Sequence, residues 1–345
     1  MVMTKVKKML EKIWNELEVE AQNVSEIGIL KRLIDKNPGS KHFLFAGLRL
    51  PSKSRVFMLV VKKGALSMKK ELPQLRGFTF SIDSLPQSNE VGLLLSASGP
   101  VYHEIFLAVA NDLYGRITGT ENETAATSAF IDRMYEWQAF FEKRSPEGLS
   151  PEEQRGLYGE LYFLQNILFP SKQDLNSQIE GWTGPLGRQH DFQFGETSVE
   201  VKTSSAKQHQ KMLVTGEQQL DETLVKRLFV FFLSISLVQN SDATLPDLIQ
   251  EIRTVLRENV LAQLNFEKAL FERGYLDVQQ DKYLSVGYHI REFCTFSVAG
   301  DFPRLTAKGM PLGVGDLRYS IAVDECRKYQ VPESELLNSI YKRAA

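Results

Sequence analysis

Cysteine is scarce in this sequence: only Cys294 and Cys326 occur among its 345 residues. They form neither a disulfide framework nor a zinc motif, and such low cysteine usage is typical of a reducing compartment. Apolar runs long enough to cross a membrane are also missing, so we expect no signal peptide and no membrane span. The sequence therefore predicts a cytoplasmic protein with no membrane partner.

Several common catalytic motifs are missing as well. His103-Glu104 begins like the zinc-binding pattern H-E-x-x-H, but position 107 is Leu107. Gly313-Val314-Gly315 lacks the third glycine of a dinucleotide-binding loop. The chain has no phosphate-binding lysine loop and no G-x-S-x-G nucleophile elbow. Any nucleotide-driven movement would therefore depend on a partner protein.

The composition is that of an ordered globular protein. With 43% hydrophobic residues and a net charge of −2, the chain is long enough for two or three packed units. We expect an N-terminal mainly β domain (1–145), a catalytic core (146–240) and a C-terminal α+β extension packed on the core (241–345). A polar segment at 119–128 and a helix near 130–143 are expected to connect the first two.

Residues 41–80 form a strongly basic segment in a chain whose net charge is close to zero. This segment has three strand-like runs, and it carries one acidic residue, Glu71, against nine basic ones. The nine are Lys41, Arg49, Lys53, Arg55, Lys62, Lys63, Lys69, Lys70 and Arg76. Two interpretations stay open: the basic surface holds a nucleic-acid backbone, or the lysines solvate strand edges and prevent aggregation.

The stretch HDFQFGETSVEVKT, from His190 to Thr203, carries the strongest chemical signal. Alternating apolar residues predict two short strands, and Gly195-Glu196 suits a two-residue type II′ turn between them. Pairing Phe194 with Thr197 would then place Asp191 opposite Glu200, with Lys202 two residues further along the same face. The expected core face of the hairpin consists of Phe192, Phe194, Val199 and Val201.

Two opposed carboxylates favour a bound cation. Like charges opposite each other on a sheet cost about 0.2–1 kcal/mol, and a cation between them reverses the sign. Carboxylate oxygens suit Mg²⁺, which uses one or two carboxylates besides water and phosphate oxygens, and we expect Mn²⁺ to substitute for it. The alternative is an exposed strand face on which Glu200 and Lys202 are merely solvated.

A second carboxylate-bearing element lies upstream. Ser150-Pro151-Glu152-Glu153 has the pattern of a helix N-terminus with a capping box, and leucines then recur at helical spacing. Glu160 falls within that leucine stripe, so the helix directs a carboxylate along its apolar face. A buried carboxylate needs a partner, which is either an arginine such as Arg155 or Arg188, or a metal or metal-bound water.

Together, these residues resemble the PD-(D/E)XK nuclease superfamily. Glu160 on a helix, then Asp191, then Glu200-Val201-Lys202 follow its pattern, and the segments GLYGELYFL, HDF and VEVKTS are similar to an uncharacterised bacterial family assigned to it. The resemblance implies an α/β (α+β) fold with a restriction-endonuclease-like αβββαβ core over about 150–238. The core elements would be a helix from 150, strands near 189–194, 198–203 and 211–215, a helix near 218–225 and a strand at 228–237.

The resemblance also implies the roles of the site residues. Asp191 and Glu200 would bind the metal, Lys202 would orient or activate the attacking water, and Glu160 would support the metal shell. His190 stands where many members have proline. Other members place a glutamine on the helix after the third core strand, a role that Gln218 or Gln219 would fill.

Two hypotheses about function follow. The first is a Mg²⁺-dependent endonuclease acting on DNA, of restriction or phage-defence type, working as a homodimer if it cuts both strands symmetrically or with partner proteins of a defence system. The second is a nucleic-acid-binding or assembly subunit of a defence complex that keeps the fold without cutting. The presence of Asp191, Glu200 and Lys202 together favours the enzyme.

Overall fold

The computed structural model divides into two compact units. It describes residues 2–24, 27–35, 42–66, 72–75, 77–86, 88–99, 102–143, 148–221, 225–306, 310–311 and 315–341. Unit 1 comprises Met1–Gly148 and Leu276–Gln279, and unit 2 comprises Leu149–Tyr275 and Gln280–Ala345.

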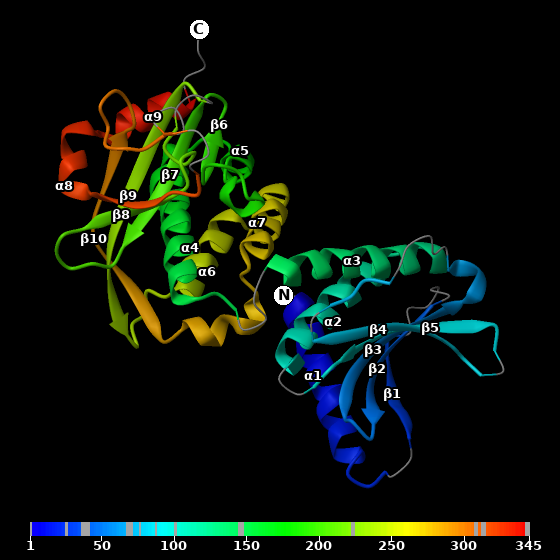
Figure 1. Ribbon diagram of the computed structural model, residues 1–345. Coiled ribbons are helices and arrows are strands. Elements are labelled where there is room, and N and C mark those ends of the chain that lie inside the picture. The colour runs from blue at the N-terminus through cyan, green and yellow to red at the C-terminus, as the bar shows by residue number, and fades with distance from the viewer. Residues whose placement is uncertain are drawn as a thin grey trace. The chain divides into compact units, whose positions relative to one another are not determined.

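Unit 1 is built on an antiparallel sheet with the strand order β1-β2-β3-β5-β4. The strands are β1 (Gly28–Asp35), β2 (Phe43–Leu50), β3 (Ser54–Lys62), β4 (Phe78–Ser84) and β5 (Glu90–Ala97). Three helices pack beside it (Figure 1): α1 (Val2–Glu20), α2 (His103–Ile117) and α3 (Glu123–Lys143). Aromatic rings from the sheet and from the helices stack in the core between them, as Phe57 does on Phe130.

The helix α3 begins earlier than the sequence predicted. The segment 119–128 was expected to be a polar connection, yet its second half is the first turn of the helix. The side chain of Asn122 accepts a hydrogen bond from the backbone N–H of Ala125 at 2.9 Å, so Asn122 caps the helix. The alanines that follow are strong helix formers, which outweighs the polar character of the segment.

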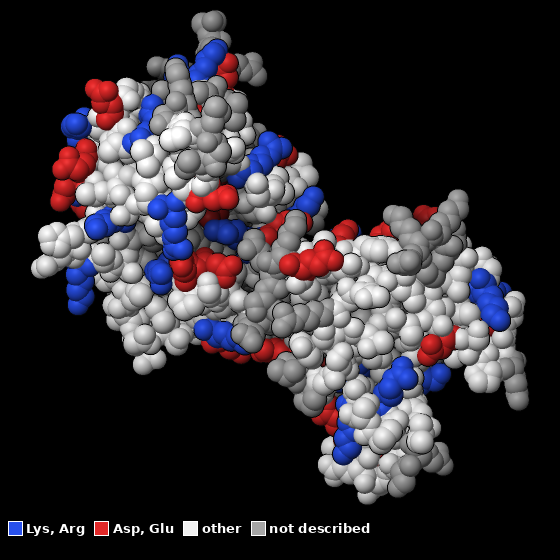
Figure 2. Space-filling model, viewed as in Figure 1, with Lys and Arg blue, Asp and Glu red and all other residues white. Residues whose placement is uncertain are grey.

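The described basic residues of 41–80 do not form one patch. Lys53 and Lys62 are both exposed but lie at opposite ends of β3, and Arg55 pairs with Glu18 of α1 at 2.9 Å. On the visible face of unit 1, Lys and Arg are scattered among uncharged residues (Figure 2). Four of the nine predicted basic residues lie outside the described residues: Lys41, Lys69, Lys70 and Arg76.

Unit 2 contains a mixed sheet with the strand order β12-β10-β9-β7-β6. Its strands are β6 (Phe192–Phe194), β7 (Thr197–Ser204), β9 (Arg227–Gln239), β10 (Val286–Ser297) and β12 (Gln330–Val331). The strands β7 and β9 are parallel, and the other pairs are antiparallel. A separate two-stranded ribbon joins β8 (Lys211–Thr215) to β11 (Arg318–Ala322).

Both faces of the central strand β9 are covered, as its almost wholly apolar sequence predicts. On one face, Phe229, Phe231 and Leu233 contact the helices α4, α6 and α7. On the other face, Leu228 and Phe232 pack with the β8–β11 ribbon. The helices of unit 2, several of which appear around the sheet in Figure 1, are α4 (Pro151–Phe163), α5 (Leu175–Glu180), α6 (Leu245–Leu256), α7 (Val260–Arg273), α8 (Val323–Cys326) and α9 (Glu333–Tyr341).

The α/β fold class and the order of its first elements are confirmed, but one core element differs. Helix α4 precedes β6, β7 and β8, as expected, but the short helix α5 lies between α4 and β6, and β8 pairs with β11 outside the main sheet. The predicted helix near 218–225 is wrong for its described part, because residues 217–220 form turns. Gly216, with φ +108°, ends the strand, and the Gln219 side chain accepts a hydrogen bond from the Thr215 N–H at 3.0 Å, which closes a turn at this point. Residues 222–224 lie outside the described residues.

Within the part of the chain that the structure describes, no helix combines the length and the apolar composition needed to cross a bilayer.

Candidate active site

The predicted hairpin forms with the predicted register. Phe192 pairs with Val199 and Phe194 pairs with Thr197, so the loop contains two residues. Gly195 has φ +58°, the conformation that a type II′ turn needs at its first central position. Phe192, Val199 and Val201 are buried in the core, which confirms the apolar face. The opposite face of β7 is left to carry Glu200 and Lys202.

Asp191 lies one residue before β6, at the end of the hairpin. Its Oδ2 accepts a hydrogen bond from the Val201 N–H at 2.8 Å. Its backbone carbonyl accepts from the N–H groups of Thr183 and Gly184 at 2.8 and 2.9 Å. The 183–184 segment thereby fixes the backbone of Asp191 and directs its carboxylate toward β7.

Glu200 and Lys202 form a buried polar chain along β7. Lys202 Nζ donates to Glu200 Oε1 at 2.8 Å and to Gln219 Oε1 at 2.9 Å. Only 5% of the Glu200 side chain and 13% of the Lys202 side chain are exposed. Of the two glutamines considered from the sequence, Gln219 is the one whose side chain contacts Lys202, and it does so from a turn.

Glu160 comes from helix α4, whose predicted N-terminus is confirmed. Ser150 and Glu153 form the reciprocal capping box. Glu160 is buried, and its partner is an arginine that the sequence did not indicate: Arg273 Nη2 and Nε donate to Oε1 at 2.6 and 3.1 Å. The indole N–H of Trp182 donates to Oε2 at 2.7 Å. Oε1 therefore accepts two hydrogen bonds and Oε2 accepts one.

Close packing of α4 on β7 sets the position of Glu160. A Cβ atom at Gly159 would lie 2.0 Å from Thr203 Oγ1, so the helix approaches the strand where glycine leaves space. A Cβ atom at Gly184 would lie 3.0 Å from Asp191 Oδ1 and 3.2 Å from Glu160 Oε2. Glycine at 184 therefore leaves a cradle beside these two carboxylates.

The pKa of Asp191 is raised well above its ordinary value. Burial is the largest cause, and the negative charges of Glu200 and Glu160 add to it, while the Val201 N–H and Lys202 oppose it. Burial also lowers the pKa of the adjacent His190, against the opposing influence of Glu200. Asp191 therefore holds its proton more tightly than an ordinary carboxylic acid does.

Sequence reasoning missed Arg273, Trp182 and Gly184. Arg273 follows Glu160 by 113 residues and ends a different helix, so no spacing rule connects the two. Trp182 and Gly184 stand just before the HDF segment, in the run GWTGP, and the small and rigid residues of that run were the available signal.

Comparison with known proteins identifies the family. Residues 10–324 match the family model described as "Putative PD-(D/E)XK family member, (DUF4420)". The chain belongs to this family. No curated protein and no solved structure matches the chain significantly.

Membership of a PD-(D/E)XK family implies a divalent metal, and part of the site fits one. Asp191 Oδ1 and Glu200 Oε2 accept no hydrogen bond from any described residue, so each carboxylate has one oxygen for a ligand. Across the described residues, no three His, Cys, Asp or Glu side chains converge to hold a metal ion. Mg²⁺ needs only one or two carboxylates, so Asp191 and Glu200 fit it, whereas Glu160 is held by Arg273.

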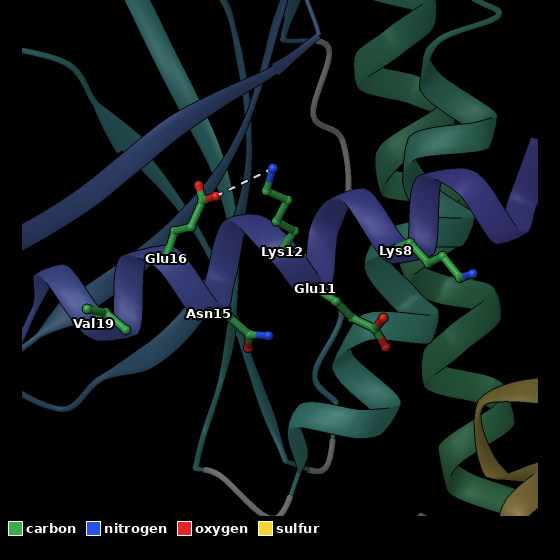
Figure 3. A pocket seen from close by; sticks show the side chains of 6 residues that line it. All are labelled: Lys8, Glu11, Lys12, Asn15, Glu16 and Val19. Atoms are coloured by element: carbon green, nitrogen blue, oxygen red, sulfur yellow. Dashed lines mark ion pairs between the residues drawn. The ribbon is translucent and has the colours of Figure 1, made fainter.

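One face of unit 2, the unit that contains the candidate site, is mixed in charge. Acidic and basic side chains intersperse on the visible face of unit 2 (Figure 2). A separate hollow runs along the exposed side of α1 in unit 1 (Figure 3), lined by Lys8, Glu11, Lys12, Asn15, Glu16 and Val19. That hollow contains none of the predicted site residues, and its lysines and glutamates follow one helix face, as expected of a solvated surface.

Proposed function

We propose that this protein is a Mg²⁺-dependent endonuclease that hydrolyses phosphodiester bonds in DNA. The observation that carries the proposal is the constellation of Asp191, Glu200 and Lys202 at one end of the β6–β7 hairpin, in which Glu200 is buried and the other two are partly buried. Its family supports a nuclease-like function. A role in restriction or phage defence, with partner proteins or as a homodimer, is part of the proposal and rests on the resemblance alone.

The cation would be held by Asp191 and Glu200. When bound, it would lower the pKa of a coordinated water and neutralise phosphate oxygens. Asp191 is suited to this role because its oxygen Oδ1 lies beside the cradle at Gly184, and because burial and the neighbouring carboxylates, which raise its pKa, favour a bound cation as partner for its charged form. Glu200 contributes its second oxygen from the face of β7.

Lys202 would act on the attacking water and the phosphate. Its ammonium group is held by Glu200 and Gln219, so it is oriented before substrate arrives. A fixed positive charge near the reacting phosphate stabilises the extra negative charge of the transition state without reorganisation. The third ammonium hydrogen donates to no described residue, so it would be available to the nucleophile.

The test is a cleavage assay with purified protein. Supercoiled, linear and single-stranded DNA and RNA are each incubated with Mg²⁺, Mn²⁺ or EDTA. We expect cleavage of DNA with either metal and none with EDTA. Lys202→Ala and Asp191→Asn should each lower the rate by about 100-fold or more, as expected for loss of an electrostatic or acid–base group. Lys211→Ala, an exposed lysine on β8, is the matched control and should cleave at the wild-type rate.

The outcomes separate the candidate functions. Cleavage of RNA alone would assign a different substrate to the same site. Cleavage that persists in Lys202→Ala would contradict the role of the lysine. Folded protein that binds DNA, does not bind Mg²⁺ and cuts none of the substrates would favour the non-catalytic binding subunit.

A further inference from the structure

Glu160 is committed to an ion pair rather than open to a cation. Its side chain is 3% exposed and that of Arg273 is 22% exposed, so the pair is largely out of water. Arg273 donates twice to Oε1 and Trp182 donates to Oε2. Removing one partner from a buried, hydrogen-bonded charge pair is strongly destabilising, so recruiting Glu160 as a metal ligand would carry that cost.

The guanidinium of Arg273 lies near Asp191, one of the two proposed ligands of the cation. A Cβ atom built at Gly156 would lie 3.4 Å from its Nη2, an ordinary contact distance, so the guanidinium lies against α4. The cradle at Gly184 touches both Asp191 Oδ1 and Glu160 Oε2, which places the Glu160–Arg273 pair next to Asp191. The positive charge of Arg273 is therefore part of the same site.

We propose that the site binds a single divalent cation, held by Asp191 and Glu200, and that the Arg273 guanidinium takes the place of a second one. This inference rests on the proposed function. A two-metal site holds its ions about 3.5–4 Å apart and needs carboxylates for both. Here the third carboxylate, Glu160, is already paired with the guanidinium of Arg273, whose positive charge would repel a second divalent ion.

The N–H groups of Arg273 that do not contact Glu160 are suited to bind phosphate oxygens, as a second cation would. Two of its five N–H groups meet Glu160, and the others donate to no described residue. A guanidinium presents a planar fork that matches phosphate oxygens, and it keeps its charge at any physiological pH. Anchored by Glu160, Arg273 would contact the scissile phosphate.

The decisive experiment counts bound Mn²⁺ in the full-length protein by calorimetry and by paramagnetic resonance of free Mn²⁺. We expect one ion per chain in the wild type, and binding at least about tenfold weaker in Asp191→Asn, because the variant loses a charged ligand. Two ions in the wild type would overturn the single-cation proposal and leave the nuclease proposal standing. No bound ion would overturn the nuclease proposal itself.

Variants of Arg273 test whether its positive charge weakens the binding of the divalent ion. Arg273→Gln should bind the ion roughly tenfold more tightly, since a nearby like charge is removed. Arg273→Lys keeps the charge and should bind it as the wild type does. Arg253→Gln breaks the comparable Arg253–Glu267 pair between α6 and α7 and should leave ion binding unchanged. Unchanged binding in folded Arg273→Gln would overturn the proposal, and if that variant fails to fold, the wild-type count still decides.

Phosphate contact is tested without catalysis, by the fluorescence anisotropy of a short labelled DNA oligonucleotide in the presence of Ca²⁺. Arg273→Gln should bind it about tenfold more weakly than Arg253→Gln, because it loses a charged contact to the backbone. Equal binding by the two variants would show that Arg273 does not contact substrate.

Discussion

At the scale of single residues, Asp191 is a carboxyl group whose ionisation the surrounding fold disfavours. Burial and two neighbouring carboxylates raise its pKa, so ionising Asp191 in the metal-free fold costs more free energy than ionising it in the unfolded chain. A residue placed at such a cost is typical of a functional position, because the cost disappears when its ligand arrives.

The first prediction at this scale concerns pH. The folded-state pKa of Asp191 lies above the ordinary value of 3.8, so the native state holds this proton more tightly than the unfolded chain does. Its stabilising contribution is present below that value and is lost as the pH rises through the folded-state pKa. In EDTA, Asp191→Asn should therefore be more stable than the wild type at neutral pH, by a margin that shrinks toward pH 4. Urea unfolding at a series of pH values measures this difference.

Adding Mg²⁺ provides the control for that measurement. The wild type should gain stability with Mg²⁺, because only the folded state binds the ion, while Asp191→Asn should gain little. A variant that is less stable than the wild type in EDTA at every pH would contradict the assigned cause of the shift.

The residues of the site were predictable to different degrees. Asp191, Glu200 and Lys202 lie within one hairpin, so alternation and a two-residue turn were enough to place them on adjoining positions. The partner of Glu160 was not predictable, because Arg273 comes from a helix that reaches Glu160 only in the folded chain. Nearby arginines such as Arg155 and Arg188 were the candidates that spacing offered, and neither is the partner observed.

At the scale of elements, the contact of α4 with β7 controls the site, because it positions Glu160. We predict that Gly159→Ala destabilises the protein by about 1–3 kcal/mol, the usual cost of overpacking a tight contact. The reason is the 2.0 Å approach of a Cβ atom to Thr203 Oγ1. Thermal or urea unfolding measures the change.

Two further variants make this prediction specific. Gly115→Ala, on the exposed side of α2, meets nothing within 4 Å and should be neutral or stabilising, by up to about 1 kcal/mol, as alanine favours helix. Adding Thr203→Ala to Gly159→Ala removes the atom responsible and should recover much of the loss. If the double variant were no more stable than Gly159→Ala, the clash with Thr203 would not be the cause.

Elements were predicted well where local chemistry decides them. The capped start of α4 and the strand β9 follow from short patterns of caps and apolar residues. The segment 217–220 is not a helix, because Gly216 and the side chain of Gln219 stabilise a turn. From this turn, Gln219 accepts a hydrogen bond from Lys202. Helix α3 began earlier than predicted because one asparagine, Asn122, caps it.

At the scale of the whole molecule, each unit has its own tryptophans. Trp14 and Trp137 lie in unit 1, and Trp182 lies in unit 2 beside Glu160. A variant with Trp14→Phe and Trp137→Phe leaves Trp182 as the reporter of unit 2, and Trp182→Phe leaves the reporters of unit 1.

We predict that Mg²⁺ raises the unfolding midpoint that Trp182 reports and leaves that of unit 1 unchanged. Binding to the native state alone stabilises by about 2.7 kcal/mol at a ligand concentration of 100 times Kd. Fluorescence-detected urea unfolding of the two variants, with Mg²⁺ and with EDTA, measures the shift. Equal shifts in both variants would mean that the two units unfold as one cooperative body.

The segment Leu276–Gln279 has a consequence for how this gene can change. It lies in the chain after α7 yet belongs to unit 1, so the chain enters unit 1 twice. A split of the gene between the codons for residues 148 and 149 would leave unit 1 without these four residues and unit 2 with all of its own. Unit 2 is therefore encoded in full on one side of that junction, whereas a relative that carried residues 1–148 alone would lack part of unit 1.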